Sequence, residues 1–262
     1  MNLFFNKFTS NLFLYMIFIR SLIFKQFEEI TFGFSTKIGG RSGAPYFFNL
    51  SMSVGDDKNK VKRNRKLFFK AAGISSTKIV FQKQVHGNNI TYVTTPGFCG
   101  ESDSMITDKT DLGLAVSTGD CVAVFIYDRK NKVIAAIHSG WRGTEKKIVE
   151  KTLEKLKNEF NSSPENLFVY LAPSISQKNY EVGEEVASLF EEKYLRQKDK
   201  KFLLNVAQAN YDMLINFEIS KENIQISNLC SYDVDHLLHS YRRDGAYSGR
   251  ALGVIAMKEK YA

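Results

Sequence analysis

GLAVSTGDCVAVFIYDRKNKVIAAIHSGWRGT, residues 113–144, is the stretch that decides the fold of this chain. It holds three short apolar runs, at 113–118, 121–128 and 132–140, and only turn residues separate them. Short runs that stay apolar throughout are typical of strands that are buried on both faces. The stretch therefore predicts three successive strands at the centre of a sheet structure, followed by a glycine-rich turn.

The sequence on either side of this stretch mixes strand and helix patterns. Because the central strands follow one another without intervening helices, the order favours an α+β fold over a doubly wound sheet. Residues 61–73 have helical spacing and end on Gly73, a natural C-cap, and we expect 90–93 to pair with the strand at 78–87. The other predicted strands are 30–40, 104–107, 166–175 and 253–258, and the other predicted helices are 144–160, 183–195 and 205–219.

The chain of 262 residues has the size and composition of one compact domain. It has no Pro- or Ser-rich linker, so we expect a single domain at 30–262 behind an apolar N-terminal extension at 1–29. The apolar run at 12–19 is far shorter than the roughly 20 residues that span a bilayer, and no small-residue cleavage site follows it. We therefore expect a cytoplasmic protein without stable membrane anchoring.

The formal charge of +8 suits an anionic partner, such as nucleic acid, a membrane surface or a phosphorylated small molecule. In runs such as KKIVEKTLEKLKNEF, however, lysines alternate with acids, and aromatic residues do not interleave with them as in base-stacking sites. We therefore expect no nucleic-acid partner, and a monomer or a weak homodimer. The three cysteines lack CxxC spacing, which argues for a reducing compartment rather than a disulfide framework.

Three residues with metal-binding side chains stand at the ends of predicted strands. His86 follows the apolar FQKQV, Cys121 follows STGD and opens the next strand, and His138 ends the run VIAAI. Functional side chains often gather where strands run into loops at the mouth of a sheet. The pattern makes convergence of the three residues credible.

Two kinds of chemistry use such a set. Two imidazoles and a thiolate bind zinc and leave a fourth position open, which is the pattern of a catalytic zinc site. Alternatively, Cys121 is a nucleophile with one histidine as its base, and Asp120 orients that base or a ligand. The spacing matches no standard ligand pattern, so an inert buried cysteine and two hydrogen-bonded histidines are an equal alternative on these residues alone.

Loops rich in glycine and arginine supply candidate substrate contacts. In HSGWRGT, Gly140 and Gly143 let the backbone approach a ligand closely, and Arg142 adds a forked cation. GGRSGAPYFFNLS offers Arg41 and Asn49, and HSYRRDGAYSGR contains three arginines suited to phosphate or carboxylate. Each loop is also compatible with an ordinary turn that carries its charges in solvent.

Taken in order, these motifs resemble those of the YfiH family. The resemblance rests on QVHG, STGDCVAVFIYD and AAIHSGWRGT, together with FSTKIGGRSGAPYFFNLS, VGDD, ESDSMIT, LAPSISQKNYEVGEEV and SYRRDGAYSGR. It extends from about residue 31 to the C-terminus. It implies a single α+β domain of mixed sheets in α/β/β/α layers, and it places the family's zinc ligands and catalytic residues at His86, Cys121 and His138.

The resemblance also implies an activity: a zinc-dependent purine nucleoside phosphorylase that acts on adenosine, inosine or methylthioadenosine and phosphate, with adenosine deaminase activity. It makes Arg41, Arg142 and Arg243 candidates for contacts to phosphate or ribose. The family's other labels leave two alternatives, a cysteine- or metal-dependent hydrolase that edits peptidoglycan precursors and a copper-dependent polyphenol oxidase. The chain has four histidines, too few for a multicopper site.

Overall fold

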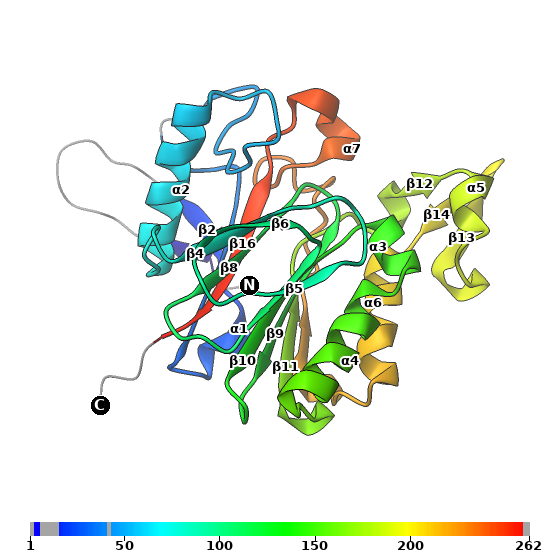
Figure 1. The fold of residues 1–262 in the computed structure, drawn as a ribbon. Helices are drawn as coiled ribbons and strands as arrows, with labels where there is room; N and C mark the ends of the chain where they lie inside the picture. Colours follow the sequence, from blue (N-terminus) through cyan, green and yellow to red (C-terminus); the bar gives the residue numbers. More distant parts are fainter. Residues whose placement is uncertain (1–2, 6–15, 41–42, 259–262) are drawn as a thin grey trace.

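The structure, a computed structural model, describes residues 3–5, 16–40 and 43–258, and two mixed β-sheets form its centre (Figure 1). Within these residues the first sheet has seven strands and is antiparallel except where β4 runs parallel to both of its neighbours. Its strands, in spatial order, are β1 (Leu3–Phe5), β2 (Ile17–Ile19), β3 (Ile30–Ser35), β16 (Ala251–Met257), β8 (Gly113–Thr118), β4 (Ile79–Lys83) and β6 (Gly97–Glu101).

The second sheet is built around the antiparallel pair of strands that the stretch at 113–144 predicts. All residues of this pair, β9 and β10, are buried, because both faces of the sheet are covered. The pairs β5–β7 and β11–β15 are parallel. The described strands, in spatial order, are β15 (Ile224–Ile226), β11 (Leu167–Leu171), β9 (Val122–Asp128), β10 (Val133–Ser139), β7 (Ser104–Thr107) and β5 (Ile90–Tyr92).

The two sheets pack face to face, and helices cover their outer faces (Figure 1). Large side chains such as Phe34, Phe125 and Tyr170 fill the space between the sheets. Helix α2 packs on the first sheet, and helices α4 and α6 pack on the second. The predicted α+β class, with its layers of helix, sheet, sheet and helix, is confirmed.

The helices are mostly short, and two of the three longer ones end as the sequence predicts. Gly73 closes α2 in the left-handed conformation, with φ of 83°. The predicted helix at 183–195 is wrong beyond its first turn, because the chain turns away after Ala187, forms a 3-10 turn at Glu192–Tyr194 and enters a hairpin of a small sheet at Leu195. The helices are α1 (Leu22–Lys25), α2 (Lys58–Ala72), α3 (Trp141–Glu145), α4 (Ile148–Phe160), α5 (Glu184–Ala187), α6 (Val206–Asn216) and α7 (Tyr241–Asp244). The small sheet contains β12 (Glu181–Val182), β14 (Lys201–Leu204) and β13 (Leu195–Lys198).

The predicted pairing of 90–93 with the strand at 78–87 is also wrong. Strand β4 belongs to the first sheet, whereas β5 pairs with β7 in the second. The chain between them crosses from one sheet to the other, and His86 lies on this crossing with φ of 58°. The crossing, which local sequence patterns do not reveal, is what brings His86 to the shared end of the two sheets.

Part of the predicted N-terminal extension belongs to the packed domain. Strand β2 pairs with β3, and Phe18 and Phe24 are buried in the core. The packed domain thus includes residues 16–29, which the predicted boundary at residue 30 leaves out, while residues 1–2 and 6–15 lie outside the described residues. None of the described helices has the length and apolar character needed to cross a membrane.

Candidate metal centre

His86, Cys121 and His138 come together at one end of the two sheets. Cys121 directly precedes β9, and His138 lies near the end of the antiparallel strand β10, where it pairs with Ala123. The sheet register therefore places the thiol beside the buried imidazole, and the crossing from β4 to β5 adds His86. The three ligand atoms lie within 4.8 Å of one another, and the two imidazole rings are nearly perpendicular, at 87°.

A buried carboxylate, Asp103, contacts the imidazole of His138 and the backbone of His86. Its Oδ1 accepts hydrogen bonds from His138 Nδ1 at 2.8 Å and from the His86 backbone N–H at 3.1 Å. Its Oδ2 accepts from the N–H groups of Val85 and Gly87, at 3.2 and 2.7 Å. One fully buried side chain thus holds the turn that carries His86, and directs Nε2 of His138 toward the site.

The charges of this cluster favour a thiolate. Burial alone would raise the pKa of Cys121, but the charge of His138 and hydrogen bonds from both imidazoles lower it to about 6. Burial alone would likewise lower the pKa of His138, but the Cys121 charge and the Asp103 hydrogen bond raise it to about 9. A thiolate is both the metal-binding and the nucleophilic form of cysteine, so this ionisation is compatible with either chemistry.

The glycine after β10 is required by the closeness of the backbone to the cluster. A Cβ at Gly140 would lie 2.9 Å from Cys121 Sγ, which real side chains essentially never show, and 3.2 Å from His86 Cδ2, which is a tight contact. Any larger residue at position 140 would therefore displace a candidate ligand. The predicted close approach of the backbone at HSGWRGT is present, and it is directed at the cluster.

Asp120, the neighbour of Cys121, points away from the cluster. Its carboxylate accepts hydrogen bonds from the Ser231 hydroxyl and the Arg242 backbone N–H, both at 2.6 Å. Its backbone φ of 106° turns the chain sharply just before β9. The expectation that Asp120 orients a histidine is wrong. Asp103, which directly precedes β7, makes the hydrogen bond to His138 instead.

The three side chains suit a borderline metal ion such as zinc. Two neutral imidazoles and one thiolate are the donor types that zinc prefers, and a carboxylate behind a ligating histidine is a recurrent feature of zinc sites. Zinc would hold such donors roughly 3.5 Å apart, so the present spacing needs only small side-chain adjustments. His138 is buried, Cys121 is partly exposed and His86 is exposed, so one side of the cluster is open.

The open side faces a cavity of about 660 Å³. His86, Cys121 and His138 line it, and so does the outer face of the first sheet, with Ala115 and Leu252. Two arginines line it as well. Arg65 lies over the Phe81 ring at 4.1 Å and donates to the Leu50 carbonyl, and Arg250 lies 5.1 Å over the Tyr241 ring.

Of the predicted substrate contacts, the three that the structure describes, Asn49, Arg142 and Arg243, lie outside the cavity lining. Arg142 is exposed and stacks on Trp141, with 4.2 Å between the guanidinium and the ring. Asn49 is fully buried, and its Oδ1 accepts from the backbone N–H of Arg250 at 3.0 Å, so it positions this arginine. Arg41 lies outside the described residues.

Arg243 is held by its own chain. It donates to the carbonyls of Ser231, Tyr232 and Leu238 at 2.8 to 2.9 Å, and it forms an ion pair with Asp244. The guanidinium therefore ties the segment before α7 together.

We expect Arg243→Ala to lower the free energy of unfolding by about 2–4 kcal/mol, because three carbonyls lose their donor. Arg142→Ala, the control with an exposed guanidinium, is expected to cost less than about 1 kcal/mol. Denaturant unfolding measures both. An Arg243→Ala protein of wild-type stability with a raised KM for phosphate would instead identify Arg243 as a substrate ligand.

Three residues at or behind this cavity were not predicted from the sequence. Asp103 stands in ESDSMIT, one of the motifs of the family resemblance, but its distance along the chain from the histidines hid its role. Arg250 ends the cluster HSYRRDGAYSGR, in which Arg243 was the predicted contact, and it is the arginine of this cluster that lines the cavity. Arg65 is one of many cations in α2, and nothing in its spacing distinguishes it.

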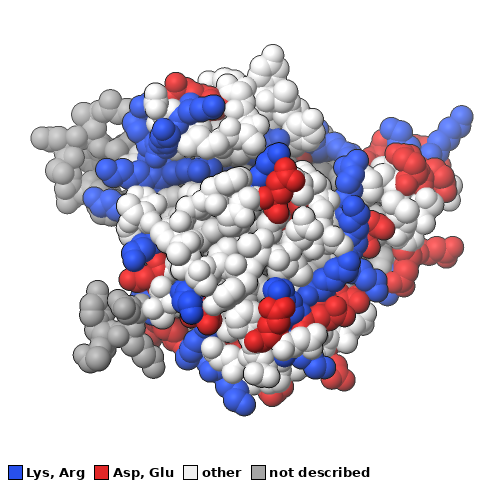
Figure 2. Space-filling view, viewed as in Figure 1, with Lys and Arg blue, Asp and Glu red and all other residues white. Residues whose placement is uncertain are grey.

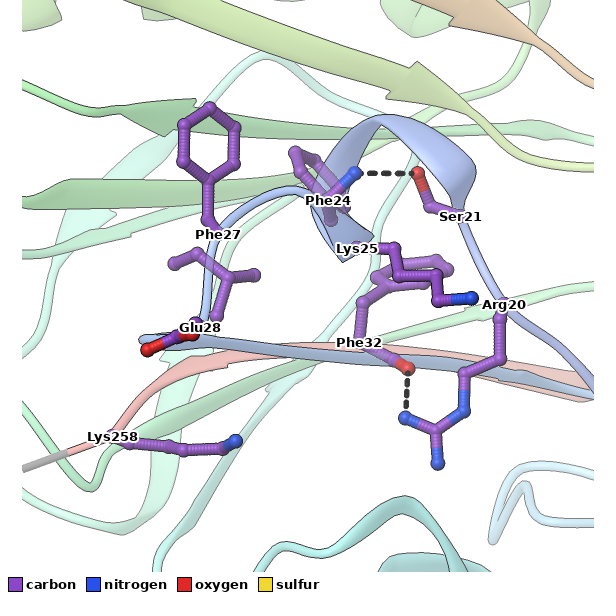
Figure 3. Close-up of a pocket in the computed structure, with 9 residues that line it drawn as sticks. Arg20, Ser21, Phe24, Lys25, Phe27, Glu28, Phe32 and Lys258 are labelled. Carbon is purple, nitrogen blue, oxygen red and sulfur yellow. Dashed lines mark hydrogen bonds between the residues drawn. The ribbon is translucent and has the colours of Figure 1, made fainter.

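A second hollow, of about 330 Å³, lies beside α1 (Figure 3). Arg20, Lys25 and Lys258 surround it with phenylalanines such as Phe24. The Arg20 guanidinium donates to the Phe32 carbonyl at 3.3 Å, as the close-up shows. No histidine or cysteine is among its described lining residues, so the reactive side chains belong to the larger cavity.

Comparisons with known proteins agree on one family. A family model described as multi-copper polyphenol oxidoreductase laccase matches residues 31–258. The chain is 31% identical over 248 residues to a purine nucleoside phosphorylase of Bacteroides thetaiotaomicron, a match that covers 87% of this chain and 92% of that protein. It is 33% identical over 219 residues to the purine nucleoside phosphorylase YfiH of Escherichia coli K12, over 80% of this chain and 87% of that protein. The crystal structure of YlmD from Geobacillus stearothermophilus matches with a TM-score of 0.87 and 25% identity, over 93% of this chain and 96% of that chain.

Proposed function

The chain belongs to the multi-copper polyphenol oxidoreductase laccase family, whose YfiH members it resembles, and we propose that it is a zinc-dependent purine nucleoside phosphorylase. The reaction joins phosphate to C1′ of the ribose of adenosine, inosine or methylthioadenosine, and the purine base leaves. Four curated relatives at 31–33% identity, from different bacteria, carry the name purine nucleoside phosphorylase.

The observation that carries the proposal is the composition of the cavity. A thiolate and two imidazoles converge beside a space of about 660 Å³, and two guanidinium groups, Arg65 and Arg250, line the same space. A volume of this size is typical of small-molecule sites. The cations suit phosphate, and the His/Cys cluster suits a metal ion.

The surface around the cavity is attractive to anions. Helix α2, which contributes Arg65, has seven cations and no acid along its length. Figure 2 shows Lys and Arg side chains gathered over this helix. A field of one sign around a cavity raises the local concentration of an oppositely charged substrate, which fits phosphate.

The side chains of the cavity have two roles: some bind the metal ion or phosphate, and others orient those ligands. Zinc, when bound, would supply Lewis-acid polarisation and lower the pKa of a water molecule to about 7. Asp103 binds Nδ1 of His138, so that Nε2 is the nitrogen left to bind the metal ion, which would displace its proton. Burial lowers the pKa of Arg65 to about 10, which leaves it a cation at neutral pH. Arg250, held by Asn49 and stacked on Tyr241, is the second anion ligand.

We further propose adenosine deamination as a second activity of the same cavity. Three protein ligands leave a position at which water can be activated, and water is the nucleophile that replaces the C6 amino group. The products are inosine and ammonia. Because this reaction needs no phosphate, assays with and without phosphate separate the two activities.

The first test is an assay of the zinc-loaded protein with inosine. We expect hypoxanthine and ribose 1-phosphate to appear in phosphate buffer, and hypoxanthine release to stop when phosphate is omitted. Chromatography of the base and of the sugar phosphate measures both products. Equal release of hypoxanthine with and without phosphate would overturn the phosphorylase proposal and indicate a nucleoside hydrolase.

The family description names a copper oxidase, but the residues of this chain do not support that chemistry. Multicopper oxidases need many histidines, and the whole chain contains four. Two of these, His236 and His239, lie outside the metal-ligand cluster formed by the described residues. A hydrolase that uses Cys121 as nucleophile is separated from the zinc enzyme by the variant discussed below.

A further inference from the structure

The lining of the cavity includes an exposed aromatic ring, Phe98, on the edge strand β6. Its side chain is 69% exposed, although it belongs to a strand of the main sheet. In the parallel pairing of β4 and β6, Phe98 is the partner of Phe81, so both side chains lie on the same face. This is the face that lines the cavity.

The two rings differ in what covers them. Phe81 is partly buried, packs against α2 and receives the Arg65 guanidinium at 4.1 Å. Phe98 stacks with no other ring or cation among the described residues. The sheet therefore holds an aromatic surface open to the cavity, next to Phe81 and the Arg65 guanidinium that lies over it.

A flat apolar surface in a cavity suits a flat ligand. A purine has two fused rings, and stacking of a base on an aromatic side chain is worth about 1–3 kcal/mol by alanine substitution. Sugar and phosphate gain nothing comparable from a phenyl ring. The cations and the His/Cys cluster serve phosphate and metal chemistry, which leaves the ring for the base.

We propose that Phe98 stacks on the purine base and holds it in the cavity. This inference rests on the proposed function, because it names the part of the cavity that binds the leaving group. Phe98 sits on a paired strand, so its backbone needs no ordering when substrate arrives. The base lies over Phe98, and the ribose extends toward the His/Cys cluster.

Calorimetric titration of hypoxanthine into the zinc-loaded full-length protein tests this inference. Phe98→Ala is expected to weaken binding by about tenfold or more, whereas Phe98→Trp keeps a stacking surface and stays near the wild-type affinity. Tyr247→Ala is the matched control, because Tyr247 is also 69% exposed but lies outside the cavity lining. In turnover, Phe98→Ala should raise KM for inosine much more than it lowers kcat.

The outcomes separate this inference from the proposed function. Equal hypoxanthine affinity in wild type and Phe98→Ala would overturn the stacking role, and phosphorolysis by the wild type would still stand. A wild type that binds hypoxanthine through Phe98 but releases none from inosine would overturn the phosphorylase alone. A wild type that neither binds hypoxanthine nor cleaves inosine would overturn both. Each variant must have the thermal midpoint and the zinc content of the wild type, so that a change in affinity reports the lost ring alone. We expect both values to be unchanged, because the Phe98 ring is exposed and packs little of the core.

Discussion

Cys121→Ala is expected to reduce the metal content from about one zinc per chain to a small fraction, and to lower inosine phosphorolysis by about a thousandfold. The reason is that the variant removes the charged member of the three-ligand set. The two remaining imidazoles are neutral ligands, and two ligands hold zinc weakly. Metal analysis of the purified protein and a hypoxanthine assay measure the two effects together.

Cys230→Ser is the control for loss of a thiol. Cys230 is buried and is not a member of the His/Cys cluster. Its Sγ accepts hydrogen bonds from Ser176 and Asn179, and a serine oxygen can accept the same bonds. It should retain wild-type zinc content and activity. A Cys121→Ala protein with full zinc and full activity would remove Cys121 from the site.

Cys121→Ser distinguishes the zinc enzyme from the cysteine hydrolase. A serine variant that keeps zinc and loses all activity would favour a nucleophilic cysteine over a ligand. A variant whose activity returns in proportion to added zinc would favour the ligand role. The thiolate state of Cys121 serves both chemistries, so only this comparison decides between them.

Asp103→Asn is expected to produce the second large effect, through position rather than direct contact. The carboxylate accepts four hydrogen bonds, from His138 and from three consecutive backbone N–H groups. An amide has one acceptor oxygen, so its NH₂ group must face at least one of these donors. We expect zinc affinity to fall by about 10–100-fold and the free energy of unfolding to fall by about 2–4 kcal/mol.

Asp128→Asn is the matched control for this variant. Asp128 is equally buried, and its carboxylate accepts from the backbone N–H groups of Lys130 and Asn131 at the turn after β9. It should lose stability without losing zinc affinity. Competition with a zinc chelator gives the affinity, and denaturant unfolding gives the stability. Unchanged zinc affinity in Asp103→Asn would show that the carboxylate supports the fold alone.

The sequence predicted the layers of this fold because its strongest signals are local. Strands covered on both faces stay apolar throughout, as in β9 and β10, and a glycine in the left-handed conformation ends α2. The partner of β5 was predicted wrongly, because β4 is its neighbour in the sequence. The chain crosses from the first sheet to the second between these two strands, so β5 pairs with β7. The predicted helix at 183–195 stops at Ala187 because the chain turns there to reach the hairpin that begins at Leu195.

The residues of the candidate site also fall into two groups, those predicted from the sequence and those that only the structure identified. The sequence by itself determined the three candidate ligands and the glycine beside them, because unusual residue types at strand ends are visible without coordinates. Only the tertiary structure decided their carboxylate partner, Asp103, and the cavity cations, Arg65 and Arg250. The stretch at 113–144 supplies two of the three ligands on neighbouring strands, whereas His86 and Asp103 reach the site through the crossing and through β7. Such contacts join residues far apart in the chain, and no local pattern encodes which of many charged residues will meet.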